Sequence, residues 1–287
     1  MAKARELKGR IRSVQNTRKI TRTMEMVSTS KLKRAQDRVE AARPYAERLA
    51  AVISRLLTPE LAARYPLLRQ PGTVRKAAVL LITSNRGLAG AFNANLIREA
   101  RGLLSRLRAE GAQAELHAAG KKGIQFFRFA GETLHTSVSD MGDRPGAADA
   151  ERLIDGLTER FVAGDLDAVY VVYAKFNSAL STPPTVMNLL PVVPPEGADT
   201  GEMDYILEPG ADEILGRILP LYVRNSVYRA LVETSAAEHG ARRTAMKNAT
   251  DNAGDLLEDL TRTYNRIRQA AITQEIAEIV GGAAALE

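Results

Sequence analysis

The sequence contains no cysteine among its 287 residues, and this absence excludes three kinds of chemistry at once. A disulfide framework, a thiolate metal site and a cysteine nucleophile all require the missing thiol. Histidine is scarce as well, and His117, His135 and His239 stand in no spacing typical of metal ligands. A metal site would therefore need oxygen ligands alone, and we predict neither a metal nor a cofactor.

Tryptophan is absent and aromatic residues make up only 5% of the chain, whereas arginine, alanine, glutamate and leucine are abundant. This composition favours long helices over β-sandwiches or barrels. No apolar run approaches the roughly 20 residues that a helix needs to cross a bilayer. The N-terminus also lacks the apolar core of a secretory signal, so we expect a soluble, intracellular chain.

Acidic residues are scarce at the N-terminus, where the positive charge of the chain is concentrated. Residues 1–57 hold fifteen Lys and Arg against five Asp and Glu, a local balance of +10 that leaves −4 for the remainder of the net +6. Such a segment could follow the phosphates of a nucleic acid, but base-stacking aromatics and a recognition-helix pattern are missing. A solvated helix face, or contact with an acidic protein surface such as the cluster of Asp251, Asp255, Glu258 and Asp259, is the preferred interpretation.

Residues 1–58 predict one long helix, because residues spaced alternately four and three apart form two rows with a period of 3.5 over about eight heptads. The rows are Leu7, Val14, Thr21, Ser28, Ala35, Ala42, Leu49 and Leu56, and Ile11, Arg18, Glu25, Leu32, Val39, Ala46 and Ile53. At 1.5 Å per residue this helix would be a rod of roughly 80 Å. Because the pattern resumes beyond Pro44, we expect a kink there rather than an end.

The two rows turn polar between Arg18 and Ser28. A second apolar stripe, formed by Ile20, Met24 and Val27, lies there on a neighbouring face of the predicted helix. Such a phase shift predicts that this stretch contacts a different surface from the rest of the helix.

Residues 73–209 predict an inserted, Rossmann-like α/β domain. Continuous apolar runs indicate buried strands at 77–83 and 168–173, and the alternation of Ala114, Leu116 and Ala118 indicates another. A strand fenced by prolines at 185–193 belongs at a sheet edge. Segments with helical spacing alternate with these strands, which is typical of a mostly parallel sheet.

Residues 210–287 return to a helical pattern, which Pro220 should kink and Gly281-Gly282 should end. Their apolar rows are Met246, Ala253, Leu260 and Ile267, and Ala249, Leu257, Tyr264 and Ala271. Neither terminal helix can bury its stripe alone, so we predict an antiparallel coiled coil of 210–287 with 1–58. The alternative, that each stripe packs on the α/β domain, is disfavoured because a domain with a radius of gyration near 14 Å cannot cover a rod of roughly 80 Å.

Two patterns could carry chemistry, and neither is specific. The turn Ser84–Gly90 follows a strand but lacks both the GxGxxG order and a Walker lysine, so a nucleotide-binding α/β enzyme with helical arms is an alternative only. Glu275 and Glu278 lie one helical turn apart, but an exposed helix face explains them better than acid/base catalysis does. We predict a non-catalytic chain.

Four blocks of sequence carry a resemblance to a known family. ITQEIAEIVGGAAA (272–285), with Ile272, Thr273, Glu275, Glu278, Gly282 and Ala283 at its defining positions, resembles the C-terminal signature of the gamma subunits of F-type ATP synthases. SVQNTRKITRTMEMVSTSKLKRAQDR (13–38), TSNRGLAGAFN (83–93) and YNRIRQAAITQE (264–275) resemble further blocks of the same family, in the same order.

The resemblance implies a central-stalk rotor without catalytic residues of its own. In that family the antiparallel helix pair stands inside a ring of alternating alpha and beta subunits, and the α/β domain binds the epsilon subunit and the membrane c-ring. Ion flow turns the c-ring and the rotor, one copy per complex, and the rotor angle drives ATP synthesis or hydrolysis on beta.

The resemblance also suggests functional residues by position. Met24 matches a family residue near the acidic loop of beta, and Arg18, Lys19 and Arg22 would face that region. Positions that touch the catalytic ring are Arg242, Gln269, Thr273 and Glu275, and a rotor tip in an apolar sleeve would comprise Ile276, Ile279, Val280, Gly282 and Ala283. The missing cysteines exclude thiol control, and the absence of a presequence before the first block implies a peripheral protein on the cytoplasmic face of a bacterial plasma membrane.

Overall fold

The structure is a computed structural model that describes residues 2–56, 64–193 and 210–284. It divides into two compact units. We call Thr29–Ala241 the sheet unit, and Met1–Ser28 with Arg242–Glu287 the paired-helix unit. Helix α1 (Ala2–Leu56) and helix α6 (Ala211–Ala284) each contribute to both units.

The sheet unit contains a five-stranded sheet in the order β3-β2-β1-β4-β5. Its strands are β1 (Lys76–Ile82), β2 (Gln113–Ala119), β3 (Leu134–Val138), β4 (Ala168–Ala174) and β5 (Pro184–Leu190). Strand β1 pairs in parallel with β2 and β4, β2 pairs in parallel with β3, and β5 runs antiparallel to β4. The mostly parallel sheet with an edge strand near 185–193 is therefore confirmed. Strand β3 was not predicted, because its sequence LHTSV contains no apolar run and its middle residues are exposed.

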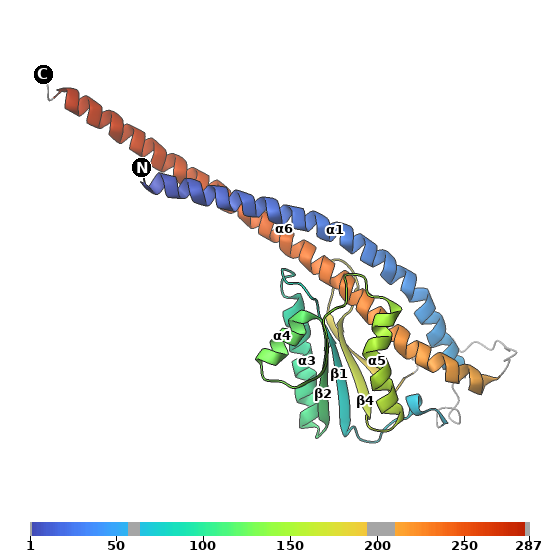
Figure 1. The fold of residues 1–287 in the computed structure, drawn as a ribbon. Helices are drawn as coiled ribbons and strands as arrows, with labels where there is room; N and C mark the ends of the chain where they lie inside the picture. Colours follow the sequence, from blue (N-terminus) through green and yellow to red (C-terminus); the bar gives the residue numbers. More distant parts are fainter. Residues whose placement is uncertain (1, 57–63, 194–209, 285–287) are drawn as a thin grey trace. The chain divides into compact units, whose positions relative to one another are not determined.

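Helices cover both faces of the sheet (Figure 1), as continuous apolar strands require. Alternate residues of β1 enter two cores: Ala78, Leu80 and Ile82 pack with α5 (Ala147–Val162), and their neighbours pack with α3 (Phe92–Ala109). The short helix α4 (Lys121–Phe129) follows β2 directly, through Gly120 at φ 102°. A Cβ at Gly120 would lie 2.1 Å from the carbonyl oxygen of Thr83, so only glycine fits this turn.

The terminal helices supply part of these cores within the sheet unit. Leu32, Ala35 and Val39 of α1 join the core on the α3 face, and Ile53 joins the core on the α5 face. The expectation that the α1 stripe does not pack on the α/β domain is therefore wrong for this stretch. The length argument took the whole rod into account, whereas residues 29–56 alone are only about 42 Å long.

The paired-helix unit contains the start of α1 and the end of α6, which lie antiparallel in Figure 1. Helix α6 runs unbroken past Gly281 and Gly282 to Ala284, so the predicted end at these glycines is wrong. Glycine within a helix costs only about 1 kcal/mol and keeps its backbone hydrogen bonds. Pro44 and Pro220 also lie inside continuous helices. The predicted N-terminal helix end at residue 58 and the acidic link at 196–209 lie outside the described residues.

Candidate functional site

The basic stretch of α1 presents its charges to solvent and its seam to α6. Arg18, Lys19 and Arg22 are exposed, whereas Thr21 is buried and Met24 is half-buried. The apolar stripe beside them stays largely uncovered, with Ile20 60% and Val27 50% exposed. This stretch of the helix therefore combines exposed positive charge with exposed apolar surface.

The register of the helix pair follows from two contacts within the paired-helix unit. The hydroxyl oxygens of Thr21 and Thr250 lie 2.7 Å apart in a buried position. The guanidinium group of Arg18 lies against Gly254, 3.6 Å from where a Cβ would stand. Moving three residues back along α1 thus moves four residues forward along α6, as antiparallel helices require. Sequence analysis missed Thr250 and Gly254, because neither belongs to the apolar rows.

The end of α6 extends beyond its partner helix, as Figure 1 shows. With Thr21 opposite Thr250, the first residue of α1, Ala2, falls opposite roughly residue 269, and about 15 residues of α6 follow, or ~22 Å. Ile272, Ile276, Ile279 and Val280 share one face of this extension and are 48%, 56%, 72% and 62% exposed. Gly282 and Ala283 lie in its last turn, and their side-chain positions are outside the described residues.

The remaining positions suggested by the resemblance do not form one cluster. Gln269, Thr273 and Glu275 are exposed near the start of the extension, where the Thr273 hydroxyl donates to the Gln269 carbonyl at 3.0 Å. Arg242 is buried, 7% exposed, and lies 27 residues earlier on α6, about 40 Å along the helix. The candidate residues therefore fall into separate bands along the shaft.

The acidic cluster of α6 forms ion pairs within its own helix. Asp251 pairs with Lys247 at 3.0 Å and Glu258 pairs with Arg262 at 3.1 Å, in both cases one helical turn apart. These pairs are exposed and contribute little to stability. The expected attraction between the basic helix and this cluster has to compete with these local partners.

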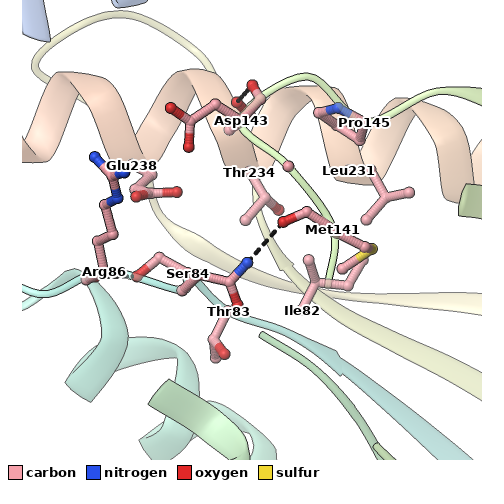
Figure 2. Close-up of a pocket in the computed structure, with 13 residues that line it drawn as sticks. Ile82, Thr83, Ser84, Arg86, Met141, Asp143, Pro145, Leu231, Thr234 and Glu238 are labelled. Carbon is pink, nitrogen blue, oxygen red and sulfur yellow. Dashed lines mark hydrogen bonds between the residues drawn. The ribbon is translucent and has the colours of Figure 1, made fainter. Parts of the chain in front are cut away.

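The turn Ser84–Gly90 lies beside a pocket of about 50 Å³, which is too small for a nucleotide. Its floor comes from the end of β1, and α6 closes it with Leu231, Thr234, Ser235 and Glu238 (Figure 2). The Ser84 hydroxyl donates a hydrogen bond to the Arg86 carbonyl at 2.6 Å and also lies 3.0 Å from the side-chain oxygen of Asn93. The nucleotide-binding alternative therefore has no support at this turn.

A buried polar cluster on β2 was not predicted from the sequence. Arg160 of α5 donates two hydrogen bonds to Glu115, at 2.7 and 3.0 Å, and these bonds lower the pKa of the Glu115 carboxyl to about 2 although burial opposes them. His117 is 3% exposed, and burial lowers its pKa to about 4. His117 and His135 are neighbours, with ring centroids 5.7 Å apart, because β2 and β3 pair. The histidines thus meet in space despite their sequence spacing.

Within the described ranges, no three His, Asp or Glu side chains are grouped to hold a metal ion. None of the helices in those ranges combines the length and the hydropathy of a membrane span.

Comparison with known proteins agrees with this geometry. The sequence profile of the ATP synthase family matches residues 3–286. The ATP synthase gamma chain of Gemmatimonas aurantiaca is 61% identical over 289 residues, which span 100% of both chains. That of Moorella thermoacetica is 48% identical over 288 residues, again 100% of both chains.

Solved structures share the fold at low sequence identity. The rotor of the Euglena gracilis mitochondrial ATP synthase matches with a TM-score of 0.68 and 19% identity, over 94% of this chain and 99% of that one. The central stalk and c-ring structure from Tetrahymena thermophila gives 0.63 and 24%, over 80% and 99%. The predicted fold class, long terminal helices with an inserted Rossmann-like α/β domain, is confirmed. Sequence identity along the full chain settles the family: this protein belongs to the ATP synthase gamma chains.

Proposed function

We propose that this chain turns as the rotor of the central stalk of an ATP synthase and couples ion-driven rotation to catalysis on neighbouring subunits. As a gamma chain it is a non-catalytic subunit of the F1 sector. The observation that carries the proposal is the extension of α6, a single helix with an apolar face that no part of α1 covers. A shaft end of this kind fits an apolar sleeve supplied by other subunits.

The coupling surface is proposed to comprise two bands. The lower band is the exposed basic stretch of Arg18, Lys19 and Arg22 with Met24, placed to meet an acidic loop of a beta subunit. The upper band holds Gln269, Thr273 and Glu275, followed by the tip residues Ile276, Ile279, Val280, Gly282 and Ala283. Arg242 is proposed as a third, buried contact position. Because Arg18, Lys19 and Arg22 lie on one side of α1, the basic band attracts an acidic loop most strongly when it faces that loop. The apolar tip forms few directional contacts and so resists turning little.

Rotation can then do work because the rotor angle biases a conformational equilibrium in each beta subunit. The bias is reciprocal, so torque can release ATP and ATP hydrolysis can produce torque. The partners are the alpha and beta subunits, the epsilon subunit and the membrane c-ring. We place the assembled protein at the cytoplasmic face of a bacterial plasma membrane, and the pairing of 1–58 with 210–287 around an α/β domain at 73–209 is the proposed domain plan.

Reconstitution tests the proposal as a whole. Alpha and beta subunits should co-purify with this chain, and the ATPase activity of the assembly should fall when the chain is omitted. ATP hydrolysis by the isolated chain, or full activity without it, would contradict the proposal.

Charge and apolar substitutions test the two bands separately. Lys19→Ala with Arg22→Ala should lower the ATPase rate of the reconstituted assembly, whereas Lys33→Ala, at another exposed lysine of α1, should leave it unchanged. Ile276→Asp with Ile279→Asp should impair rotation, whereas Leu180→Asp, at a 91% exposed position outside the shaft, should not. Equal behaviour of test and control variants would refute the assignment of that band.

A further inference from the structure

Helix α6 occupies the place where open α/β sheets usually bind ligands. In such folds the ligand crevice lies at the carboxyl ends of the strands, where the strand order reverses. Here that position is the end of β1 and β4, and α6 side chains line the small pocket left there (Figure 2). The sheet therefore binds a helix of its own chain at the position where a related fold would bind a small molecule.

Three consecutive polar residues of α6 form hydrogen bonds at this edge of the sheet, and all three are buried. Glu233, Thr234 and Ser235 are 3%, 4% and 9% exposed. The Phe176 N–H donates to the Glu233 carboxylate at 3.1 Å, and the Ala174 N–H donates to the Thr234 hydroxyl at 3.3 Å.

Ser235 bonds to a second loop, because its hydroxyl donates to the Asp143 carbonyl at 3.3 Å. Successive helical residues point about 100° apart, so the three bonds hold α6 over roughly 200° of its circumference.

The same two loops also hold α1 within the sheet unit. The Asp143 carboxylate forms an ion pair with Lys31, which lowers the pKa of the Asp143 carboxyl below its ordinary value. The Phe176 carbonyl accepts a hydrogen bond from Arg43 at 3.3 Å. Asp143 and Phe176 are therefore each bonded to both terminal helices, Asp143 to Lys31 and Ser235, and Phe176 to Arg43 and Glu233.

We propose that this double clamp, Asp143 and Phe176 with their partners on α1 and α6, transmits torque, within the sheet unit, between the β-sheet with its loops and the two terminal helices. Apolar packing is strong but non-directional, and much of the α6 surface that enters the cores is alanine and valine, such as Ala230, Val232 and Ala236. Hydrogen bonds have a preferred direction and weaken steeply when misaligned. These hydrogen bonds therefore oppose rotation of the β-sheet about the two helices within the sheet unit. Apolar contacts alone resist that rotation less. The inference rests on the proposed rotor function.

The test measures torsional stiffness in the assembled complex with alpha and beta subunits. Because the chain has no cysteine, Phe129→Cys, at a 93% exposed position of α4, attaches a bead specifically to the sheet unit when the alpha and beta subunits used are cysteine-free variants. With the catalytic ring fixed to a surface and held by a non-hydrolysable nucleotide, the spread of bead angles reports compliance between ring and sheet unit. Glu233→Gln with Thr234→Val, and Lys31→Met with Ser235→Ala as a milder pair, should broaden this spread. Glu213→Gln and Thr158→Val should not, because among the described residues this carboxylate and this hydroxyl bond only within their own helices.

Hydrogen exchange supplies the second measurement. The amides of Ala174 and Phe176 should exchange about five- to tenfold faster in Glu233→Gln with Thr234→Val, as loss of one net hydrogen bond implies. Faster exchange with an unchanged spread of bead angles in folded, assembled variants would overturn the clamp. Failure of the wild-type bead to rotate with ATP would instead overturn the rotor function itself.

Discussion

Replacing His117 should remove a defined part of the pH dependence of folding. The imidazole is 3% exposed, its Nδ1 atom lies 2.8 Å from the Thr136 hydroxyl, and Glu115 is its nearest charged neighbour at 3.6 Å. Burial outweighs the attraction of Glu115 and lowers the pKa of His117 from 6.5 to about 4. The folded state therefore keeps this ring neutral under conditions in which the unfolded chain protonates it.

The sign and size of the effect follow from linkage. Between pH 6.5 and 4 the unfolded chain binds a proton that the folded chain does not, so stability falls as pH falls. The difference of about 2.5 pKa units corresponds to roughly 3 kcal/mol at 1.36 kcal/mol per unit. Glu115, whose pKa is lowered from 4.5 to about 2, adds a further loss between about pH 4.5 and 2, where the unfolded chain protonates this carboxylate and the folded chain does not.

Urea unfolding followed by tyrosine fluorescence measures this loss. No tryptophan masks the signal, and six of the eight tyrosines lie in the described part of the sheet unit. In wild type, the free energy of unfolding should fall by roughly 3 kcal/mol between pH 6.5 and 4 because of His117 alone. In His117→Gln this part of the fall should be missing. Parallel wild-type and His117→Gln curves would refute the reasoning.

Two further substitutions test the packing. Gly120→Ala should destabilise the sheet unit by on the order of 3–5 kcal/mol, because its Cβ would clash with Thr83 at a positive φ. The control Gly102→Ala, within α3 and with open space around it, should raise the melting temperature slightly. Equal effects of the two variants would contradict the close approach of Gly120 to Thr83. Thr250→Val should lower the free energy of unfolding by about 1–2 kcal/mol and speed hydrogen exchange of nearby α1 amides, because it leaves the buried Thr21 hydroxyl without that partner. Thr21→Val should destabilise the Thr250→Val variant less than it destabilises wild type. Strictly additive effects would argue against a direct bond.

The sequence predicted the long helices and the sheet because their patterns are local and repeated. Heptad rows predict a helix regardless of which surface buries their side chains. The buried residues of α1 from Leu32 to Ile53 belong to the predicted rows. Strand β1 is apolar on both faces, which allows only a covered position in a sheet. Strand β3 has no such pattern, and its pairing with β2 is visible only in three dimensions.

The candidate site was predictable as a set of positions but not as an arrangement. The basic stretch and the apolar tip stand out in the sequence, and their exposure follows from how far α1 reaches along α6. The register depends on Thr21 meeting Thr250, a contact between residues 229 positions apart. Likewise, Glu233, Thr234 and Ser235 look like ordinary helix residues until the loops that they bind are in place.

Direct observation of rotation tests the central claim most directly. A bead attached through Phe129→Cys to the otherwise cysteine-free chain, in an assembly whose catalytic ring is made of cysteine-free variants and fixed to a surface, reports the angle of this subunit alone. On addition of ATP the bead should turn continuously in one direction, at a rate proportional to the measured hydrolysis. A bead that only fluctuates about one angle while the ring hydrolyses ATP at its full rate would contradict the account.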